Sequence, residues 1–219
     1  MKTKKRIILI GAGGHCKVIV DAIKLGKEFD IYGITDAKLP AKTKILGAPV
    51  LGKDEILPDI FRKGIKYAFI SVGSVKDCSV RKAIDKELKK IGFKLAVIIH
   101  PGAIIAKDSE IGEGAFVAAG AVINPGSKIG RNAIINTSAS IDHDCEIGDF
   151  VHVAPGATLS GGIKVGSETH IGTGANIIQY LKIGKQCLVK AGALLTSNLA
   201  DGETWAKTDR KFEYENKPE

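Results

Sequence analysis

The sequence is poor in aromatic side chains and has no apolar run long enough to span a membrane. Aromatic residues make up 5% of the 219 positions, with one methionine and one tryptophan. The interior therefore has to be built from Ile, Val, Leu and Ala rather than from large rings. Because a membrane helix needs about 20 consecutive apolar residues, we expect no membrane insertion.

Paired cysteines are also missing. The four cysteines show no CxxC pair and no spacing typical of zinc ligands, so we expect no metal site. Free thiols are typical of a reducing compartment, which predicts a cytoplasmic protein. The start, MKTKKRIILIGAGG, resembles a signal peptide only in part. Its apolar stretch is short and ends in glycines, which favours a buried first strand.

The charge balance is positive but not concentrated. Charged residues make up 26% of the chain, apolar residues 44%, and the net charge is +8. These proportions are typical of a folded globular protein. Beyond the basic start the lysines are spread along the chain, so no nucleic-acid partner is predicted. A positive balance also suits a protein that binds polyphosphate compounds.

Residues 1–97 alternate between apolar strands and amphipathic helices. RIILIGAGG, FDIYGITD, KYAFISVGS and KLAVIIHP have the composition of strands. HCKVIVDAIKLGK, KDEILPDIFRKG and VKDCSVRKAIDKELKKIGF have the spacing of helices. Strands that alternate with helices form parallel sheets. We therefore predict a small Rossmann-like α/β domain over residues 1–97.

From residue 99 an aliphatic residue recurs at every sixth position, seventeen times without a slip. A second residue, usually small or apolar, follows four positions later. This is the period of a β-helix whose flat faces are short strands joined by tight turns. Each coil buries its apolar side chains only against its neighbours, so the stack needs caps. We predict a β-helix over residues 98–200, capped by the first domain and by residues 201–219. The aliphatic positions are Ile99, Ile105, Ile111, Val117, Ile123, Ile129, Ile135, Ile141, Ile147, Val153, Leu159, Val165, Ile171, Ile177, Ile183, Val189 and Leu195.

This repeat resembles the hexapeptide-repeat acyltransferases. The segments IILIGAGGHCKVIVDAI, ITD, SVG, IIHP and NTSASIDHDCEIGDFVHVAPGATLSGGIKVG narrow the resemblance to bacterial sugar acetyltransferases that N-acetylate UDP-4-amino-sugars in bacillosamine-type pathways. Relatives act on GDP-perosamine, and others are known as sialic acid O-acetyltransferases. The resemblance covers nearly the whole chain. It implies a left-handed parallel β-helix, a homotrimer with active sites between neighbouring β-helices, and acetyl-CoA as co-substrate.

His143 is the candidate catalytic base. It follows the inward Ile141 by two positions, so alternation places it outside the core near a corner of the coil. The resemblance implies that this histidine is the general base and that the acid after it, Asp144, raises its basicity. The family member from the bacillosamine pathway has Glu there, and Asp142 is a rival for orienting the ring. A neutral imidazole accepts the proton that an amine or hydroxyl loses as it attacks a thioester.

Backbone groups are candidates for stabilising the oxyanion of that reaction. Gly161 and Gly162 carry no side chains, so a ligand can approach their N–H groups closely.

Further residues are candidate coenzyme contacts. The resemblance implies that His152, Thr173 and Ala191 contact acetyl-CoA. His152 and His170 occupy the same place in hexads 18 residues apart, so with three hexads per coil they should stack in adjacent coils. Buried packing is the better account of Cys145 and Cys187, which fall at small inward positions.

The glycine turn GAGGHC follows a strand and opens a helix, and Asp36 ends the next strand. This arrangement partly matches a dinucleotide fingerprint, although the domain is short for a complete Rossmann unit. Turn amides and a helix N-terminus bind diphosphates in general. The resemblance assigns Gly13, Gly14, His15 and Asp36 to nucleotide-sugar binding, with Asn136 as a further substrate contact. A turn that only permits tight packing is the alternative.

The C-terminal segment departs from the family pattern. Family members often end the β-helix with Gly-x-Pro-Ala-Lys, whereas this chain has GETWAKTDRKF, with no proline. Trp205 either stacks on the adenine of the coenzyme or caps the last coil.

The sequence thus predicts an acetyl-CoA-dependent N-acetyltransferase acting on a nucleotide-linked 4-amino-sugar. An O-acetyltransferase of sialic or legionaminic acid is the alternative within the class. A non-catalytic β-helical binding or scaffold protein is the alternative from another class, because a fold does not fix an activity.

Overall fold

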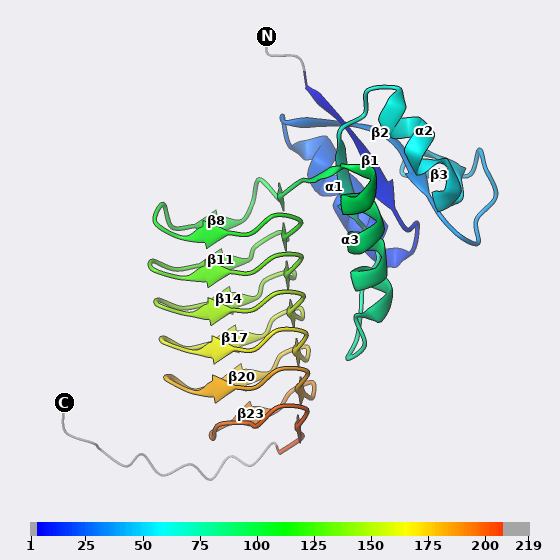
Figure 1. Ribbon diagram of the computed structural model, residues 1–219. Helices are drawn as coiled ribbons and strands as arrows, with labels where there is room; N and C mark the ends of the chain where they lie inside the picture. Colours follow the sequence, from blue (N-terminus) through cyan, green and yellow to red (C-terminus); the bar gives the residue numbers. More distant parts are fainter. Residues whose placement is uncertain (1–3, 208–219) are drawn as a thin grey trace.

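The chain combines an α/β sheet with a column of stacked triangular coils. The computed structural model describes residues 4–207. Figure 1 shows the column with the α/β part beside its first coils, and the coils follow one another along the sequence. This is a small α/β domain followed by a left-handed parallel β-helix, as the sequence predicts.

The N-terminal sheet has the strand order β3-β4-β2-β1-β5-β6. Its pairs are parallel except β3 with β4. Both faces of β1 are buried because Ile7, Ile8, Leu9 and Ile10 are almost fully covered. The strands are β1 (Lys5–Ile10), β2 (Phe29–Thr35), β3 (Lys44–Ile45), β4 (Ala48–Gly52), β5 (Tyr67–Ile70) and β6 (Lys94–Leu95), and the helices are α1 (Gly14–Leu25), η1 (Asp54–Ile56), α2 (Leu57–Arg62) and α3 (Ser79–Ile91).

The β-helix has three faces, each a parallel sheet of two-residue strands. The first face contains β7 (Ile98–Ile99), β10 (Phe116–Val117), β13 (Ile134–Ile135), β16 (His152–Val153), β19 (His170–Ile171), β22 (Leu188–Val189) and β24 (Thr204–Trp205). The second face contains β8 (Ile104–Ile105), β11 (Val122–Ile123), β14 (Ser140–Ile141), β17 (Thr158–Leu159), β20 (Asn176–Ile177) and β23 (Leu194–Leu195). The third face contains β9 (Glu110–Ile111), β12 (Lys128–Ile129), β15 (Glu146–Ile147), β18 (Lys164–Val165) and β21 (Lys182–Ile183).

The second residue of each strand points into the column. From Val117 to Leu195 these aliphatic residues form one buried core together with small residues such as Ala139 and Cys145. The predicted inward positions are therefore confirmed over most of the repeat. Before Val117 burial is incomplete, because Ile105 and Ile111 are only partly buried and Ile99 has 43% of its surface exposed. All three belong to the first coil, which has a neighbouring coil on one side only.

The turns between faces define three edges. We call the turns from first to second face the first edge, those from second to third face the second edge, and those from third to first face the third edge. From the second coil on, most turns contain one residue with positive φ. On the second edge this residue is Gly126, Asp144, Gly162 and Tyr180 in successive coils.

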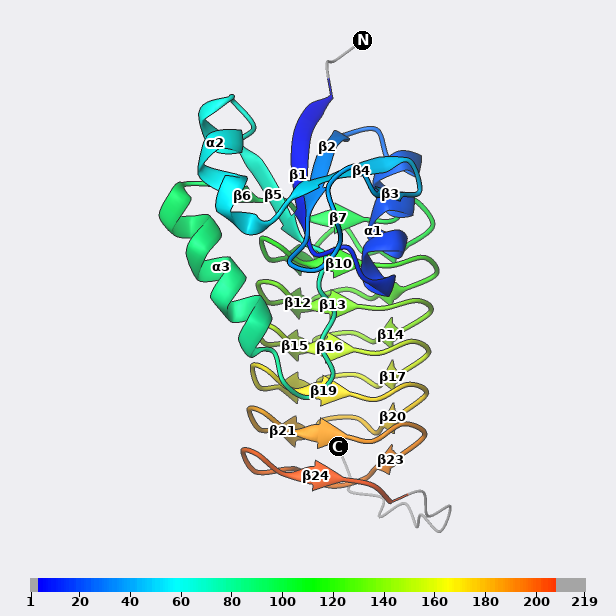
Figure 2. The ribbon, with the colours of Figure 1, turned by 90° about the vertical axis from the view of Figure 1, so that its right-hand side faces the viewer.

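The N-terminal domain covers the first face. Phe116 and Ile134 point outward from this face and pack into the apolar cluster beneath α1 and β1. Figure 2 shows the domain over this face, with α3 running down one side of the column.

Polar contacts fasten α3 to the third edge. Arg81, which is fully buried, donates to the carbonyl of Asn132, and Asp85 accepts from the Asn132 amide at 2.8 Å. Lys82 pairs with Glu168 at 2.8 Å. The α/β domain is therefore held on the column by buried apolar and polar contacts together.

Three local expectations differ from the structure. KLAVIIHP is not one strand, because β6 pairs with β5 while β7 already belongs to the β-helix. KDEILPDIFRKG divides into η1 and α2. The β3–β4 hairpin was not predicted.

The described C-terminal end caps the last coil. Trp205 donates from Nε1 to the carbonyl of Leu194 at 2.9 Å and packs against the core. This contact favours the capping alternative for Trp205. The rest of the predicted tail, residues 208–219, lies outside the described residues.

Candidate functional site

His143 lies on the second edge, in the turn between β14 and β15. Its side chain is 51% exposed, and its Nδ1 is 2.9 Å from Asp144 Oδ2. A carboxylate only accepts, so the neutral ring carries its proton on Nδ1 and presents a free lone pair on Nε2. The ring is therefore outside the core, as predicted, and it is in the tautomer that a general base requires.

The two acids beside His143 have different tasks. Asp142 Oδ1 accepts the backbone N–H of His143 at 2.8 Å and the amide of Asn124 at 3.0 Å. Asp144 is therefore the acid that contacts the imidazole. Its hydrogen bond raises the pKa of His143 above 6.5, with smaller contributions from the charges of both acids.

A glycine pair lies one coil below the imidazole. A Cβ at Gly161 would overlap the His143 ring, with Cε1 only 2.6 Å away. The N–H of Gly162 donates to the carbonyl of His143 at 2.8 Å and is not available to a ligand. Gly161 forms no hydrogen bond through its N–H within residues 4–207. Of the two expected oxyanion donors, only Gly161 fits.

The predicted nucleotide-binding turn joins β1 to α1. Gly13 caps the helix, and a Cβ at Gly13 or Gly14 would meet no protein atom within 4 Å. Asp36 accepts from the N–H of Ala12 at 2.8 Å and from two N–H groups after β2. Burial acts to raise the pKa of Asp36, but these backbone donors outweigh it and lower the pKa. Asp36 therefore holds the turn in place through a hydrogen bond to its backbone.

An open pocket of about 360 Å³ lies where this turn meets the first face. Gly14 and His15 line it from α1, and the loop 73–75 after β5 contributes a second wall. Asn136, from the first edge, and His152, from β16, complete it. The structure thus brings together four of the predicted site residues from both domains.

The pocket histidines are neutral. His152 Nδ1 is 2.7 Å from the carbonyl of Ser74, so this nitrogen must donate, and Nε2 then accepts from the amide of Asn136 at 3.1 Å. Burial lowers the pKa of His152 to about 4. Burial, with the charge of Arg81, also lowers the pKa of His15 to about 4. The pocket therefore offers neutral hydrogen-bonding groups near neutral pH.

Other predicted residues follow the first edge toward the C-terminus. Thr173 and Ala191 are exposed at equivalent turns of this edge, and Gly192 donates to the carbonyl of Thr173. His152 and His170 stack edge to face with ring centroids 4.8 Å apart, which confirms their predicted stacking. Cys145 and Cys187 are buried as predicted.

Within one chain, the pocket and the base lie on different edges. The pocket and the exposed Thr173 and Ala191 occupy the first face and first edge, whereas His143 and Asp144 occupy the second edge. The second face separates them.

Sequence reasoning missed Ser74 and Arg81. The carboxyl end of β5 was a signal for Ser74, because ligands bind at this edge of parallel sheets. Nothing in the helical pattern distinguished Arg81 from the other charged residues of α3.

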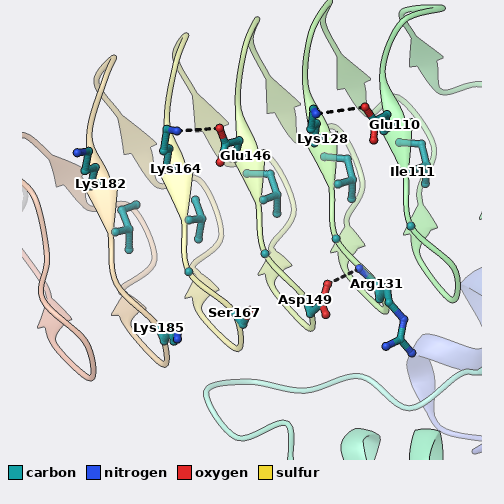
Figure 3. A pocket seen from close by; sticks show the side chains of 18 residues that line it. Glu110, Ile111, Lys128, Arg131, Glu146, Asp149, Lys164, Ser167, Lys182 and Lys185 are labelled. Carbon is teal, nitrogen blue, oxygen red and sulfur yellow. Dashed lines mark hydrogen bonds and ion pairs between the residues drawn. The ribbon is translucent and has the colours of Figure 1, made fainter.

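A further hollow, of about 690 Å³, runs along the third face. Figure 3 shows its outward side chains arranged as ion pairs, Glu110 with Lys128 and Glu146 with Lys164. None of the predicted site residues lines it. For this reason we do not assign it to the reaction.

Residues 4–207 contain neither a metal-binding cluster nor a membrane-spanning helix. No cluster of three His, Cys, Asp or Glu side chains there is arranged to hold a metal ion. None of the helices in this part of the chain has the length and apolar character needed to cross a bilayer.

Comparison with known proteins covers both domains. Residues 6–88 match the PglD N-terminal domain, and residues 96–125 and 126–161 match the bacterial transferase hexapeptide (six repeats). A structure of perosamine N-acetyltransferase from Caulobacter crescentus, a histidine mutant in complex with CoA and GDP-perosamine, is 34% identical. The match covers 93% of each chain with a TM-score of 0.84. The chain belongs to the hexapeptide-repeat sugar acyltransferase family.

Two further family members are similar. The acetyltransferase domain of PglB from Neisseria gonorrhoeae FA1090, in complex with acetyl coenzyme A, is 34% identical over 92% of this chain and 96% of that one, with a TM-score of 0.83. UDP-N-acetylbacillosamine N-acetyltransferase from Bacillus subtilis (strain 168) is 35% identical over 121 residues, 52% of each chain. The match thus spans about half the length of this curated relative.

Proposed function

We propose that this acyltransferase transfers the acetyl group of acetyl-CoA to the amine of a nucleotide-linked 4-amino-sugar, of the UDP-4-amino-4,6-dideoxy-hexose type. The observation that carries the proposal is the exposed imidazole of His143, whose Nδ1 is held by Asp144. N-acetyltransferase relatives whose structures contain CoA with GDP-perosamine, or acetyl coenzyme A, support it.

His143 acts as the general base. The sugar amine attacks the thioester carbonyl, and Nε2 accepts the proton that the nitrogen loses as the C–N bond forms. Asp144 stabilises the resulting imidazolium, and the free N–H of Gly161 donates a hydrogen bond to the oxyanion. The C–S bond then breaks, and the proton passes to the departing thiolate of CoA.

The nucleotide sugar binds at the glycine turn. Gly13 and Gly14 leave open space above the N-terminus of α1, which favours a diphosphate. His15 and Asn136 contact the sugar from opposite sides of the pocket. Asp36 lies near the nucleotide base and orders the glycine turn. Nucleotide binding thus belongs to residues 1–97 and acetyl transfer to residues 98–200.

Acetyl-CoA binds along the first face and first edge, with His152, Thr173 and Ala191 as its proposed contacts. The reaction requires no metal. We also infer a cytoplasmic enzyme. The four cysteines are buried free thiols, which is typical of a reducing compartment.

The working unit is a homotrimer that packs through its second faces. The outward residues of this face are uncharged, unlike the charged ladder of the third face, and the N-terminal domain covers the first face over β7, β10 and β13. An uncharged face on a chain of net charge +8 favours a protein interface. The outward residues of the second face are Ile104, Val122, Ser140, Thr158, Asn176 and Leu194.

This packing unites the two halves of the site. The second face is flanked by the first and second edges, so three such faces around an axis bring the first edge of one chain beside the second edge of the next. The pocket with Asn136 then meets His143 of the partner subunit.

Release of the CoA thiol from acetyl-CoA tests the function. We expect release with a UDP-4-amino-sugar, and a His143→Ala variant should lose it while keeping its oligomeric state and melting temperature. Activity with GDP-perosamine instead would identify the nucleotide of the substrate as GDP rather than UDP. Activity only with free sialic acid would identify an O-acetyltransferase, and no turnover with any acceptor would favour a binding protein.

A further inference from the structure

Tyr180 is an exposed aromatic residue on the second edge, two coils below the base. Tyr180 is 71% exposed, and its backbone φ is +60°. Gly126 and Gly162 occupy equivalent turns of this edge. A left-handed conformation costs an ordinary residue about 1–2 kcal/mol, and burial within this chain does not offset that cost for Tyr180.

The tyrosine ring lies against the glycine pair beneath the base. A Cβ at Gly162 would be 2.5 Å from Tyr180 Cδ1 and 2.7 Å from Cε1, and a Cβ at the adjacent Gly161 would overlap His143. The imidazole and the phenol ring therefore pack from above and below on two consecutive residues. The absence of side chains at both glycines is what allows this arrangement.

We propose that Tyr180 contacts the pantetheine arm of acetyl-CoA. This inference rests on the proposed function and on the trimer described with it. Tyr180 and Thr173 belong to the same coil, because β19, β20 and β21 follow one another in it. Rotation about an axis parallel to the column keeps height, so Tyr180 stands opposite Thr173 of the partner subunit across the seam.

A thioester that reaches His143 from the direction of Thr173 and Ala191 has to pass the Tyr180 ring. Pantetheine is a narrow chain of methylene and amide groups. The face of an aromatic ring packs well against such groups, and aromatic side chains are common in the walls of small-molecule sites. Tyr180 thus provides an aromatic wall along the path of the pantetheine arm. The small residues of the first edge provide no such wall.

The test compares Tyr180→Gly with Tyr180→Phe. Glycine accepts the left-handed backbone at this position without strain, so the variant should fold and assemble like the parent. We expect Tyr180→Gly to raise the KM for acetyl-CoA by about fivefold, with the KM for the nucleotide sugar and kcat within about twofold, since one aromatic contact is typically worth about 1 kcal/mol. Tyr180→Phe keeps the ring face and should behave like the parent.

Gln186→Gly is the matched control. Gln186 also has a positive φ, of 56°, but lies on the third edge. This variant should leave the KM for acetyl-CoA unchanged. An unchanged KM in Tyr180→Gly would overturn the inference, and so would dissociation of Tyr180→Gly into monomers, because Tyr180 would then be a subunit contact.

A binding measurement separates this inference from the proposed function. Calorimetric titration with CoA alone needs no sugar acceptor, and weaker CoA binding by Tyr180→Gly than by Tyr180→Phe would support the contact. If the parent binds CoA but turns over none of the sugars, the proposed function fails while the role of Tyr180 is still measured. Equal CoA affinity in both variants would refute the role of Tyr180 without refuting the proposed function.

Discussion

Gly161→Ala tests the position of the catalytic base with a single methyl group. The new Cβ would lie 2.6 Å from His143 Cε1, whereas ordinary contacts begin at 3.4 Å. The ring therefore has to retreat by at least about 0.8 Å, the difference between the two distances, because Nε2 lies closer still. Misplacement of about 1 Å costs roughly 10²-fold in rate, which corresponds to about 2.7 kcal/mol of activation free energy.

We expect kcat of Gly161→Ala to fall about 10²-fold, with the melting temperature unchanged, because the imidazole is exposed and can move into solvent. Alanine keeps the backbone N–H, so loss of the oxyanion donor does not explain such a fall. A double-mutant cycle provides the control. In a His143→Ala background, Gly161→Ala should have no further effect. A stable Gly161→Ala variant with full activity would refute this placement of the base.

Three further predictions concern charge and packing. Asp144→Asn should move the acid limb of the kcat/KM profile to lower pH, because the hydrogen bond from Asp144 raises the pKa of His143. A limb that stays in place would contradict this. The pKa values of about 4 for His15 and His152 predict that their contribution to the free energy of unfolding is complete above about pH 6.5. Between pH 6.5 and 4 the unfolded chain binds more protons than the folded chain, so the free energy of unfolding falls by up to about 3 kcal/mol for each histidine. Denaturant unfolding at several pH values measures it, and stability independent of pH would be the contrary result. Ile141→Ala should cost about 2–5 kcal/mol of unfolding free energy, since Ile141 is fully buried. Lys164→Ala on the third face should change it by less than about 0.5 kcal/mol.

The sequence predicts the parts of the fold that depend on periodicity. A strict six-residue period determines which side chains point inward, so the core from Val117 to Leu195 follows directly. The same period places His143 outside the core and stacks His152 on His170. Alternation fails at Ile99 because burial depends on a neighbouring coil, and the first coil has one on a single side.

Other features depend on contacts that no local pattern encodes. The β3–β4 hairpin turns through Leu46 and Gly47, both with positive φ, and such turns are usually recognised by Asn or Asp at the first position. The contact of His152 with Ser74 joins residues 78 apart in the sequence. The separation of His143 from the pocket likewise appears only when the domain is seen over the first face.

Subunit complementation tests whether one chain supplies the base and the next chain supplies the pocket. His143→Ala removes the base, and Gly14→Leu fills the pocket at a position where a Cβ meets no protein atom. Each variant alone should be inactive. When both are co-expressed with different affinity tags, the trimers purified through both tags should regain activity at about a third of their sites, because each mixed trimer has one junction in three that joins an intact base to an intact pocket. Mixed trimers that remain inactive would contradict the account.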